Sequence, residues 1–493
     1  LAQALLSVLT TFLVYRIGRR IRGERVGFWA ASLLAFYPSH VAFAHYLWSE
    51  TLYTFFAVLA FHRLLAADDE GSGWGAAIGA GVALGFASLA RSLGLVLLGV
   101  SLVWLVTGGR SVAGGGVAGW RALLGTARSR RTAAIVAVTA AAIVTPWSMR
   151  ASSIAGSFVA VDVNGGFNFW SGNNEYIPYD TQGIWSVGLP LENGLDERFL
   201  RYYPDDEFRR IVPRRMAEAG LESAQGAEAS AWYLAEARRE LARDPMGLLR
   251  RAPKKLAALW APDFFLPRHL LRDWYGPTSP GLAALLVLLT WAAAAVALIG
   301  GPMAIVSLRR DRFRSLVLVW LGAYAVLHGL AYGHTRMHQP LVPMLLLAGA
   351  AFWRDPECRP DWRRYLRRGT PVAALVLAGW VAIYPLLGGL YVHPGPRHAG
   401  MARVLAAGRE FPLPGTERQL WMLAGVEASL GNVEQATRML AESRHADRPW
   451  THVMRALTAT TAADAEASLD RALELRPGLE AAVELKSRIP SAR

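Results

Sequence analysis

The sequence predicts an all-α polytopic membrane protein with a long loop outside the membrane and a soluble helical tail. Hydrophobic residues make up 53% of the chain and come in continuous runs, which is the membrane pattern. Charged residues make up only 18% and gather between these runs. The net charge of +14 comes largely from arginines that flank apolar segments. No nucleic-acid-reading motif accompanies them, so we expect no nucleic-acid partner.

Ten apolar segments are candidates for membrane helices, although several are shorter than the roughly 20 residues that an untilted spanning helix needs. The break between the fourth and fifth segments, at Arg91, is especially tight. The segments are 1–18, 26–45, 50–66, 74–90, 92–107, 132–149, 281–303, 315–332, 340–353 and 370–391.

The arginines predict how the bundle is oriented. Arginine-rich connections follow the first, fifth, seventh and ninth segments and alternate with connections poor in Lys and Arg, which places the arginine-rich ones in the cytosol. The connection after the third segment (Asp68, Asp69, Glu70) is the exception, because it carries no basic residue. The first segment would then run from outside to inside, and we expect a further helix upstream of Leu1.

Four regions follow from this pattern. The loop and the tail are both expected outside the cytosol, so any chemistry should be extracytoplasmic. The regions are 1–149 (N-terminal transmembrane helices, lacking a first helix and first outer loop), 150–280 (extracytoplasmic loop with interfacial helices), 281–391 (C-terminal transmembrane helices) and 400–493 (soluble helical-hairpin tail).

Both soluble regions show helical patterns. Ala227–Leu241 is amphipathic and ends at Asp244-Pro245, and Leu248–Trp260 mixes basic residues with Leu and Trp as an interfacial helix does. In the tail, small and turn residues resemble the helical hairpins of tetratricopeptide repeats and suggest a possible protein partner. These positions are Leu430-Gly431, Ala436, Ala465, Ala472, Leu475 and Pro477.

Three charged residues at the outer ends of membrane segments are candidates for a functional site. Glu50 begins the third segment, where an ionisable group is costly unless it is paired, solvated or metal-bound; the alternative is an ordinary charge at a helix N-terminus. Arg91 would hold an anionic headgroup or a substrate phosphate, or snorkel to the interface. Arg336 lies in a short polar connection between His334 and His338, and together they would form a phosphate clamp.

A glycine- and asparagine-rich segment in the outer loop is a candidate for sugar binding. It contains Asn164, Asn173 and Asn174 among aromatic residues. Glycine allows close backbone approach, and amide groups suit sugar hydroxyls, although turns share this composition. The sequence shows no metal-ligand spacing, serine-protease pattern, Walker loop or dinucleotide fingerprint. The lone cysteine, Cys358, excludes an intrachain disulfide.

At these residues the chain resembles the GT-C superfamily of glycosyltransferases over about residues 1–391. It is most similar to family 39, the protein O-mannosyltransferases and their bacterial relatives that modify lipid A with aminoarabinose. The patterns that carry the resemblance are Tyr37-Pro38 with Ser49-Glu50-Thr51-Leu52, Arg91 with Gly94-Leu95, Pro146-Trp147-Ser148-Met149-Arg150 with Asn164-Gly165-Gly166 and Gly172-Asn173-Asn174, and Arg336 with Pro340 and Pro343.

The resemblance implies a GT-C-type helix bundle in a bacterial plasma membrane and a polyprenyl-phosphate-linked sugar donor. The acceptor would be a protein, a lipid or a glycan. Glu50 matches the second acidic position of the family, where it would orient the acceptor or bind a metal; branches differ in metal use, so a divalent cation stays open. Arg336, Lys255 and Arg91 would contact the donor phosphate. The family's principal carboxylate lies in a first outer loop, which we expect upstream of this sequence.

Three other functions remain open from the sequence. A lipid or polysaccharide transporter should show internal repeats and ionisable residues in mid-membrane, and we find neither. A non-catalytic membrane assembly protein would use the tail to recruit partners. A polysaccharide polymerase or ligase of similar architecture is the nearest enzymatic alternative.

Overall fold

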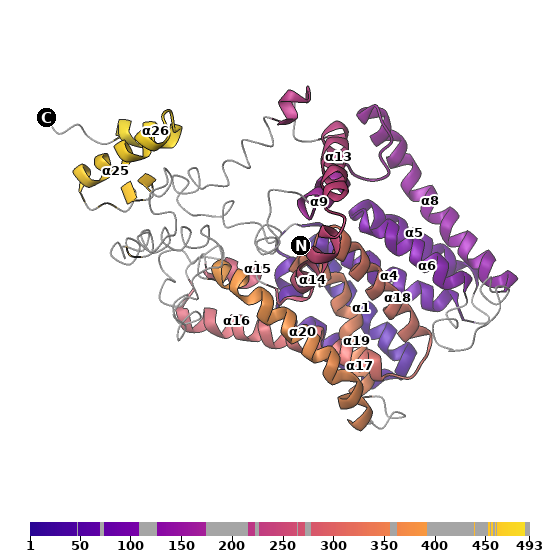
Figure 1. Ribbon diagram of the computed structural model, residues 1–493. Coiled ribbons are helices and arrows are strands. Elements are labelled where there is room, and N and C mark those ends of the chain that lie inside the picture. The colour runs from indigo at the N-terminus through magenta and orange to yellow at the C-terminus, as the bar shows by residue number, and fades with distance from the viewer. Residues whose placement is uncertain are drawn as a thin grey trace. The chain divides into compact units, whose positions relative to one another are not determined.

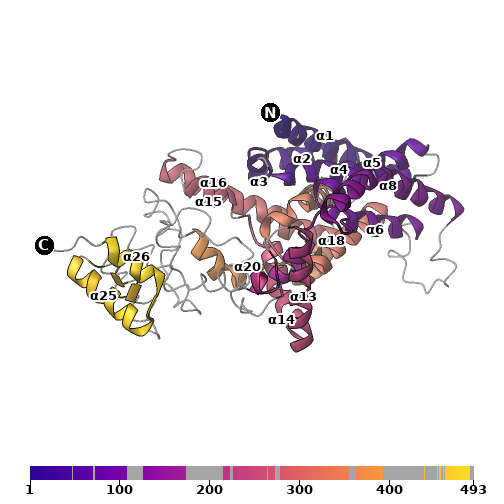
Figure 2. The same ribbon diagram turned by 90° about the horizontal axis from the view of Figure 1, so that it is seen from above.

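The computed structural model describes residues 1–107, 126–173, 215–271, 278–354, 362–391 and 461–488, with gaps at 47, 70–72, 222–225 and 264, and a few isolated residues between 438 and 459. All regular secondary structure in these ranges is helical. The chain divides into two compact units (Figures 1 and 2). Unit 1 comprises Leu1–Asn174, Gln225–Leu266 and Leu286–Ala382.

The first four helices of unit 1 follow the first three apolar segments, with one break that proline imposes. Pro38 divides the predicted segment 26–45, because proline lacks an N–H and disfavours helical backbone at the preceding residue. Tyr37 is accordingly extended, and Pro38 opens the next helix. The helices are α1 (Ala2–Arg22), α2 (Glu24–Ala35), α3 (Pro38–Phe43) and α4 (Ser49–Ala67).

The next three helices pack closely through small residues. α5 (Trp74–Ala90) and α6 (Leu93–Val106) are joined by Arg91 and Ser92 alone, as the break in the sequence predicted. α8 (Ala127–Ala155) packs against α5. A Cβ at Gly81 would lie 2.7 Å from the backbone oxygen of Val136, so this helix pair depends on glycine.

The C-terminal helices complete the bundle. α16 leads through one π turn, η2, into α17, so that Gly281–Ser307 forms one long helix. The short 3-10 helix η3 precedes α19 and carries Arg336. The bounds are α16 (Pro280–Ala295), η2 (Val296–Gly300), α17 (Gly301–Ser307), α18 (Arg312–Leu330), η3 (Thr335–Leu341), α19 (Val342–Arg354) and α20 (Trp362–Tyr391).

Three described helices are long and apolar enough to cross a membrane: Ala127–Ala155, Gly281–Ser307 and Arg312–Leu330. Trp74–Ala90 and Leu93–Val106 are apolar but shorter. With all ten apolar segments on helices, the prediction of an all-helical membrane protein is confirmed.

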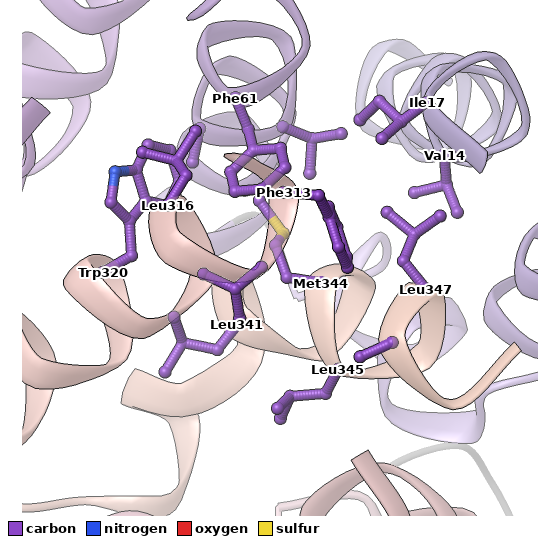
Figure 3. Close-up of a cluster of buried hydrophobic side chains, with 14 of the residues drawn as sticks. Val14, Ile17, Phe61, Phe313, Leu316, Trp320, Leu341, Met344, Leu345 and Leu347 are labelled. Atoms are coloured by element: carbon purple, nitrogen blue, oxygen red, sulfur yellow. The ribbon is translucent and has the colours of Figure 1, made fainter. Parts of the chain in front are cut away.

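The core of unit 1 lies where α4, α18 and α19 meet (Figure 3). Phe61 of α4 makes edge contacts with two aromatic rings of α18, at centroid distances of 5.9 Å to Phe313 and 5.3 Å to Trp320. Leu345 and Leu347 of α19 are also fully buried. Segments from both ends of the sequence therefore share one core, which fixes the outer ends of α4 and α18 relative to each other.

The acidic connection between α4 and α5, which the arginine pattern did not assign to either side of the membrane, lies beside the arginine-rich connections. Asp69 pairs with Arg20, which ends α1, and Asp68 pairs with Arg312, which begins α18, at 2.9 Å. Arg128, at the start of α8, donates to the backbone oxygen of Asp69 at 2.7 Å. The acidic connection thus lies at the same end of unit 1 as the arginines, where it compensates part of their charge.

The outer-loop residues within unit 1 form three helices at one end of the bundle, opposite α17 (Figure 1). α13 begins and ends as the amphipathic pattern predicted, with Asp244 following its last residue. α14 is the predicted second helix, but it packs against α18 and η3 and buries Arg251 and Lys255. The bounds are α9 (Gly165–Ser171), α13 (Ala227–Arg243) and α14 (Gly247–Trp260).

The tail contains a helical hairpin within the part of it that is described. α25 (Ala462–Leu475) and α26 (Glu480–Arg488) are joined through Gly478, whose φ of 77° suits glycine. Leu469, Ala472 and Ala482 are buried between them. The likeness to tetratricopeptide repeats stays a prediction, since Leu430, Gly431 and Ala436 lie outside the described residues, as does Cys358.

Candidate functional site

The candidate site lies at the end of unit 1 where α4 begins and α5 ends. α4 and α5 are antiparallel neighbours with a short connection at their other end. Glu50, in the first turn of α4, therefore comes beside Arg91, the residue that follows α5. The connection from α18 to α19 reaches the same point and adds Arg336 from η3.

Glu50, Arg91 and Arg336 form one ion-paired group, which we call the triad. Oε1 of Glu50 lies 2.5 Å from Nη1 of Arg91 and 3.6 Å from Nε of Arg336. The Glu50 side chain is 3% exposed, whereas those of Arg91 and Arg336 are 20% and 33% exposed. The carboxylate is thus the buried member of the triad. The two guanidiniums are partly exposed, and together they carry one positive charge more than Glu50 neutralises.

Each guanidinium has a second contact that fixes its position. Arg336 lies over the ring of Trp48, 5.6 Å from its centroid, as a cation–π pair does. Arg91 donates through Nη2 to the sulfur of Met337 at 3.2 Å. Because Met337 follows Arg336, Arg91 contacts the η3 segment through this sulfur as well as sharing Glu50 with Arg336. A planar group with five donors is suited to bind phosphate in such a fixed geometry.

Trp48 belongs to an aromatic cluster that supports the triad. Its ring lies 5.7 Å from Phe43, 5.1 Å from Tyr46 and 4.9 Å from Phe265. Phe265 in turn stacks on His334 at 5.2 Å. The segment between α3 and α4 is therefore packed against the start of η3, which brings Trp48 under Arg336.

Below the triad, α4 and α18 contribute a polar contact inside the bundle. The hydroxyl of Tyr324 donates to that of Tyr53 at 3.1 Å, and both residues are fully buried. Tyr53 lies one turn after Glu50 on the same face of α4. This contact links the two helices directly beneath the carboxylate.

Lys255 and Asn173 form a second group, which joins three segments. Nζ of Lys255 donates to Oδ1 of Asn173 at 2.8 Å and to the backbone oxygen of Leu330 at 2.9 Å. The Asn173 amide donates to the same Leu330 oxygen at 2.9 Å. Burial, and then the charge of Arg251, lower the pKa of Lys255 to about 7. In this structure Nζ of Lys255 links α14 to the end of α18 through these hydrogen bonds, and it makes no hydrogen bond with the triad.

Two glycines allow the backbone segments around Lys255 to approach this closely. A Cβ at Gly172 would lie 1.6 Å from the backbone oxygen of Ala331, and one at Gly333 would lie 1.9 Å from that of Lys255. No other residue fits such approaches without moving the backbone. The connection between α18 and α19 is thus held from both sides, by the end of α9 and by α14.

His338 is a buried imidazole that donates one hydrogen bond. Its Nδ1 bonds the backbone oxygen of Leu259 at 2.7 Å, so Nδ1 carries the proton and Nε2 is bare. Nε2 is buried and has no hydrogen-bond partner among the described residues. Burial lowers the pKa of His338 to about 4, and the Leu259 contact only partly offsets this. At neutral pH the cationic part of the expected phosphate clamp is therefore the guanidinium of Arg336, without a charge from His338.

The remaining predicted loop residues lie apart from the triad. Asn164 is exposed at the start of α9, where its N–H donates to Asp162 at 2.9 Å. α9 packs against α13. Asn174 lies outside the described residues. Sugar binding by this loop stays a prediction.

The structure also places a buried carboxylate that the sequence did not single out. Asp263 is fully buried and accepts from Ser39 Oγ at 2.8 Å and from the N–H of Phe265 at 3.1 Å. Asp263 thus links α3 to the segment after α14. It also orients the backbone of Phe265, whose ring contacts Trp48. Only the Pro262-Asp263 pair at the end of a helical pattern signals it in the sequence.

The residues present do not form a metal site of the usual kind. Across the described ranges, no three His, Cys, Asp or Glu side chains gather where a metal could bind. The carboxylate of Glu50 faces two guanidiniums, which occupy the directions that a cation would need.

Comparison with known proteins gives a family match over the N-terminal part of the chain. Residues 1–115 match the family model described as dolichyl-phosphate-mannose-protein mannosyltransferase. The match includes Glu50, Arg91 and Trp48, but not the segments that carry Arg336 and Lys255. A search of curated proteins gave no match, and neither did a search of solved structures. The first helices are therefore similar to those of membrane glycosyltransferases.

Proposed function

We propose that this protein is a membrane glycosyltransferase that takes a sugar from a polyprenyl-phosphate donor. The observation that carries the proposal is the triad, in which two arginines from distant parts of the chain meet on one buried carboxylate. The family match over residues 1–115 supports the reaction class. The acceptor would be a protein, a lipid or a glycan on the extracytoplasmic face of a bacterial plasma membrane.

The triad would bind the phosphate of the donor. Arg91 and Arg336 are the exposed members, and their combined charge exceeds that of Glu50 by one. A phosphodiester that approached them would gain charge-assisted hydrogen bonds from two planar donors. The apolar bundle beside the triad suits the polyprenyl tail.

The same arginines would act in the chemical step. An acceptor hydroxyl or amine forms a bond to the anomeric carbon, and the bond from that carbon to the phosphate oxygen breaks. Polyprenyl phosphate leaves with an additional negative charge, which two fixed guanidiniums stabilise without reorganisation. The acceptor loses its proton to a carboxylate base, the role that the resemblance gives to the family's principal carboxylate rather than to Glu50.

Glu50 would act mainly by positioning. Its Oε1 faces both arginines, so the oxygen that would accept a proton or orient an acceptor is engaged by guanidiniums. Without the carboxylate, two like charges would face each other across a buried surface and separate. We propose that Glu50 holds Arg91 and Arg336 at the spacing that the donor phosphate requires.

Transfer of labelled sugar in membranes tests the proposal. Membranes with the wild type or Glu50→Gln would be incubated with polyprenyl-phosphate-linked mannose, glucose or aminoarabinose in parallel. The wild type should transfer one of them, and Glu50→Gln should lower the rate by roughly 100-fold, as loss of a preorganised charge contact does. Glu228→Gln, on exposed α13, is the matched control and should keep full activity.

Two outcomes would contradict the proposal. Full activity of Glu50→Gln with an unchanged melting profile would remove the positioning role. Absence of transfer by the wild type with every donor would contradict the proposed glycosyltransferase activity. It would favour a non-catalytic assembly protein or a transporter. Proteins captured on the tail, or substrate movement in vesicles, would then separate those two.

A further inference from the structure

The arginine-rich end of unit 1 carries an aromatic and basic surface that the proposed reaction does not use. It is formed by the start of α2, the last turn of α19 and the first turns of α20. We call it the basic surface. Its members lie at the end that Asp68 and Asp69 compensate, and Figure 1 shows the first turns of α20 near α17 there.

The first part of this surface centres on Trp29 of α2. The guanidinium of Arg354 lies over the Trp29 ring, 4.5 Å from its centroid. Arg25 precedes Trp29 by four residues, so both lie on one face of α2. Trp29 nevertheless remains 40% exposed. One cation thus stacks on an aromatic ring that is still exposed, and a second cation lies on the same helix face.

The second part is the start of α20. Trp362 and Leu366 are one helical turn apart and are 46% and 55% exposed, so they form an apolar row. Arg363 and Arg367 have the same spacing and form an exposed basic row beside it. Such a pairing is typical of a helix that meets lipid headgroups with one side and acyl chains with the other.

One aromatic contact joins the two parts. Trp353, which precedes Arg354, meets Trp362 edge-on at 4.5 Å and is itself 46% exposed. The last turn of α19 therefore contacts α2 through Arg354 and α20 through Trp353. This places exposed tryptophans and unburied arginines on one continuous surface.

We propose that the basic surface binds the headgroup of an anionic phospholipid, with its acyl chains along the exposed tryptophans and Leu366. Guanidiniums recognise phosphate through paired hydrogen bonds, and tryptophan favours the boundary between headgroups and hydrocarbon. A zwitterionic lipid has the same acyl chains but lacks the net charge that Arg25, Arg354, Arg363 and Arg367 complement. The site would be separate from the triad, at the other end of unit 1.

The test measures lipid retained by purified full-length protein. The protein would be placed in zwitterionic nanodiscs with phosphatidylglycerol added, and bound lipid would be counted by native mass spectrometry. Arg25→Gln/Arg354→Gln should weaken phosphatidylglycerol binding by roughly tenfold, given the attraction of each arginine for an anionic surface. Arg19→Gln/Arg309→Gln removes the same charge from exposed positions outside the basic surface and should weaken binding clearly less than the first pair, because these arginines would make no direct contact with the headgroup.

Three results would overturn the proposal. The first is equal retention of phosphatidylglycerol and phosphatidylcholine by the wild type. The second is an equal loss in both double variants, which would show a diffuse charge effect. The third is competition by inorganic phosphate as strong as that by the lipid, which would show a phosphate site without lipid recognition. Single Arg354→Lys, which keeps the charge but loses the flat contact with Trp29, tests the stacking if the double variant is unstable.

Discussion

At the scale of the residue, the triad explains why three ionisable side chains are tolerated near the end of a membrane bundle. Glu50 alone would be expensive to bury, and Arg91 and Arg336 alone would repel each other. Together the two guanidiniums neutralise the carboxylate and leave one positive charge in excess, although Nε of Arg336 is buried without a hydrogen-bond partner among the described residues. The sequence identified each of the three separately, because an ionisable residue at a segment end stands out. It contained no signal that Glu50 and Arg336 form an ion pair, because they are far apart in the sequence and meet only through the packing of α4, α18 and α19.

The Lys255 group leads to a prediction on pH. The pKa of Lys255 is about 7 when folded, against an ordinary value of 10.5. Between these values the unfolded chain binds a proton that the folded chain lacks, so the free energy of unfolding rises with pH across that window. The melting temperature of the wild type should therefore rise from pH 7 to 10 relative to Lys255→Met, by an amount on the order of a few degrees.

Thermal unfolding in detergent at a series of pH values measures this difference. The melting temperatures of wild type and Lys255→Met should run parallel below pH 7, where Lys255 is charged in both states. Parallel curves over the whole range would mean that Lys255 stays charged in the folded protein. That result would also restore it as a cationic contact for the donor phosphate.

At the scale of the element, hydropathy predicted where helices lie, and single residues decided where they break. All ten apolar segments are helical, and α13 ends where Asp244 and Pro245 indicated. Pro38 divided a segment that its hydropathy alone left continuous. The mixture of basic residues with Leu and Trp predicts that α14 lies at a membrane interface, and this stays a prediction. The structure adds that α14 packs on α18 and η3, where Lys255 donates to Asn173 and Leu330, and no local pattern reveals these acceptors.

The contact of α14 with the connection after α18 predicts a sharp difference between two glycines. Gly333→Ala would place a methyl group 1.9 Å from the backbone oxygen of Lys255, whereas Gly322, on α18, has open space around its Cβ direction. Gly333→Ala should lower stability by about 1–3 kcal/mol through overpacking. Gly322→Ala should be neutral or slightly stabilising, because alanine favours helix. Melting profiles of the two variants in one detergent provide the comparison, and equal profiles would show that α14 does not dock.

At the scale of the whole molecule, the arginine pattern predicted that the arginine-rich connections lie at one end of the bundle. It did not account for the acidic connection after the third segment. The structure places Asp68 and Asp69 among arginines from α1, α8 and α18. The pattern rule counts basic residues only, so an acidic connection that neutralises its neighbours is invisible to it. The orientation of the bundle relative to the membrane remains a prediction from that rule.

This ion network should contribute to stability in a salt-dependent way. Asp68→Asn/Asp69→Asn would leave Arg20 and Arg312 without their carboxylates. Exposed ion pairs contribute roughly 0–1 kcal/mol each, so we expect a modest fall in melting temperature at low salt that shrinks at high salt. The double variant would be compared with wild type at both salt concentrations. A fall that is independent of salt would indicate lost packing rather than lost charge pairing.

The stretch between Leu330 and Leu341 has contacts with both sides of the site. Its backbone contacts Lys255 and Gly172. His338 donates a hydrogen bond to the backbone oxygen of Leu259 in α14, and Arg336 forms an ion pair with Glu50. A ligand that displaces α14 would therefore displace the guanidinium of Arg336 as well. Any ligand of α14 and any ligand of Arg336 would then be thermodynamically linked, and each would change the affinity of the other by the same factor.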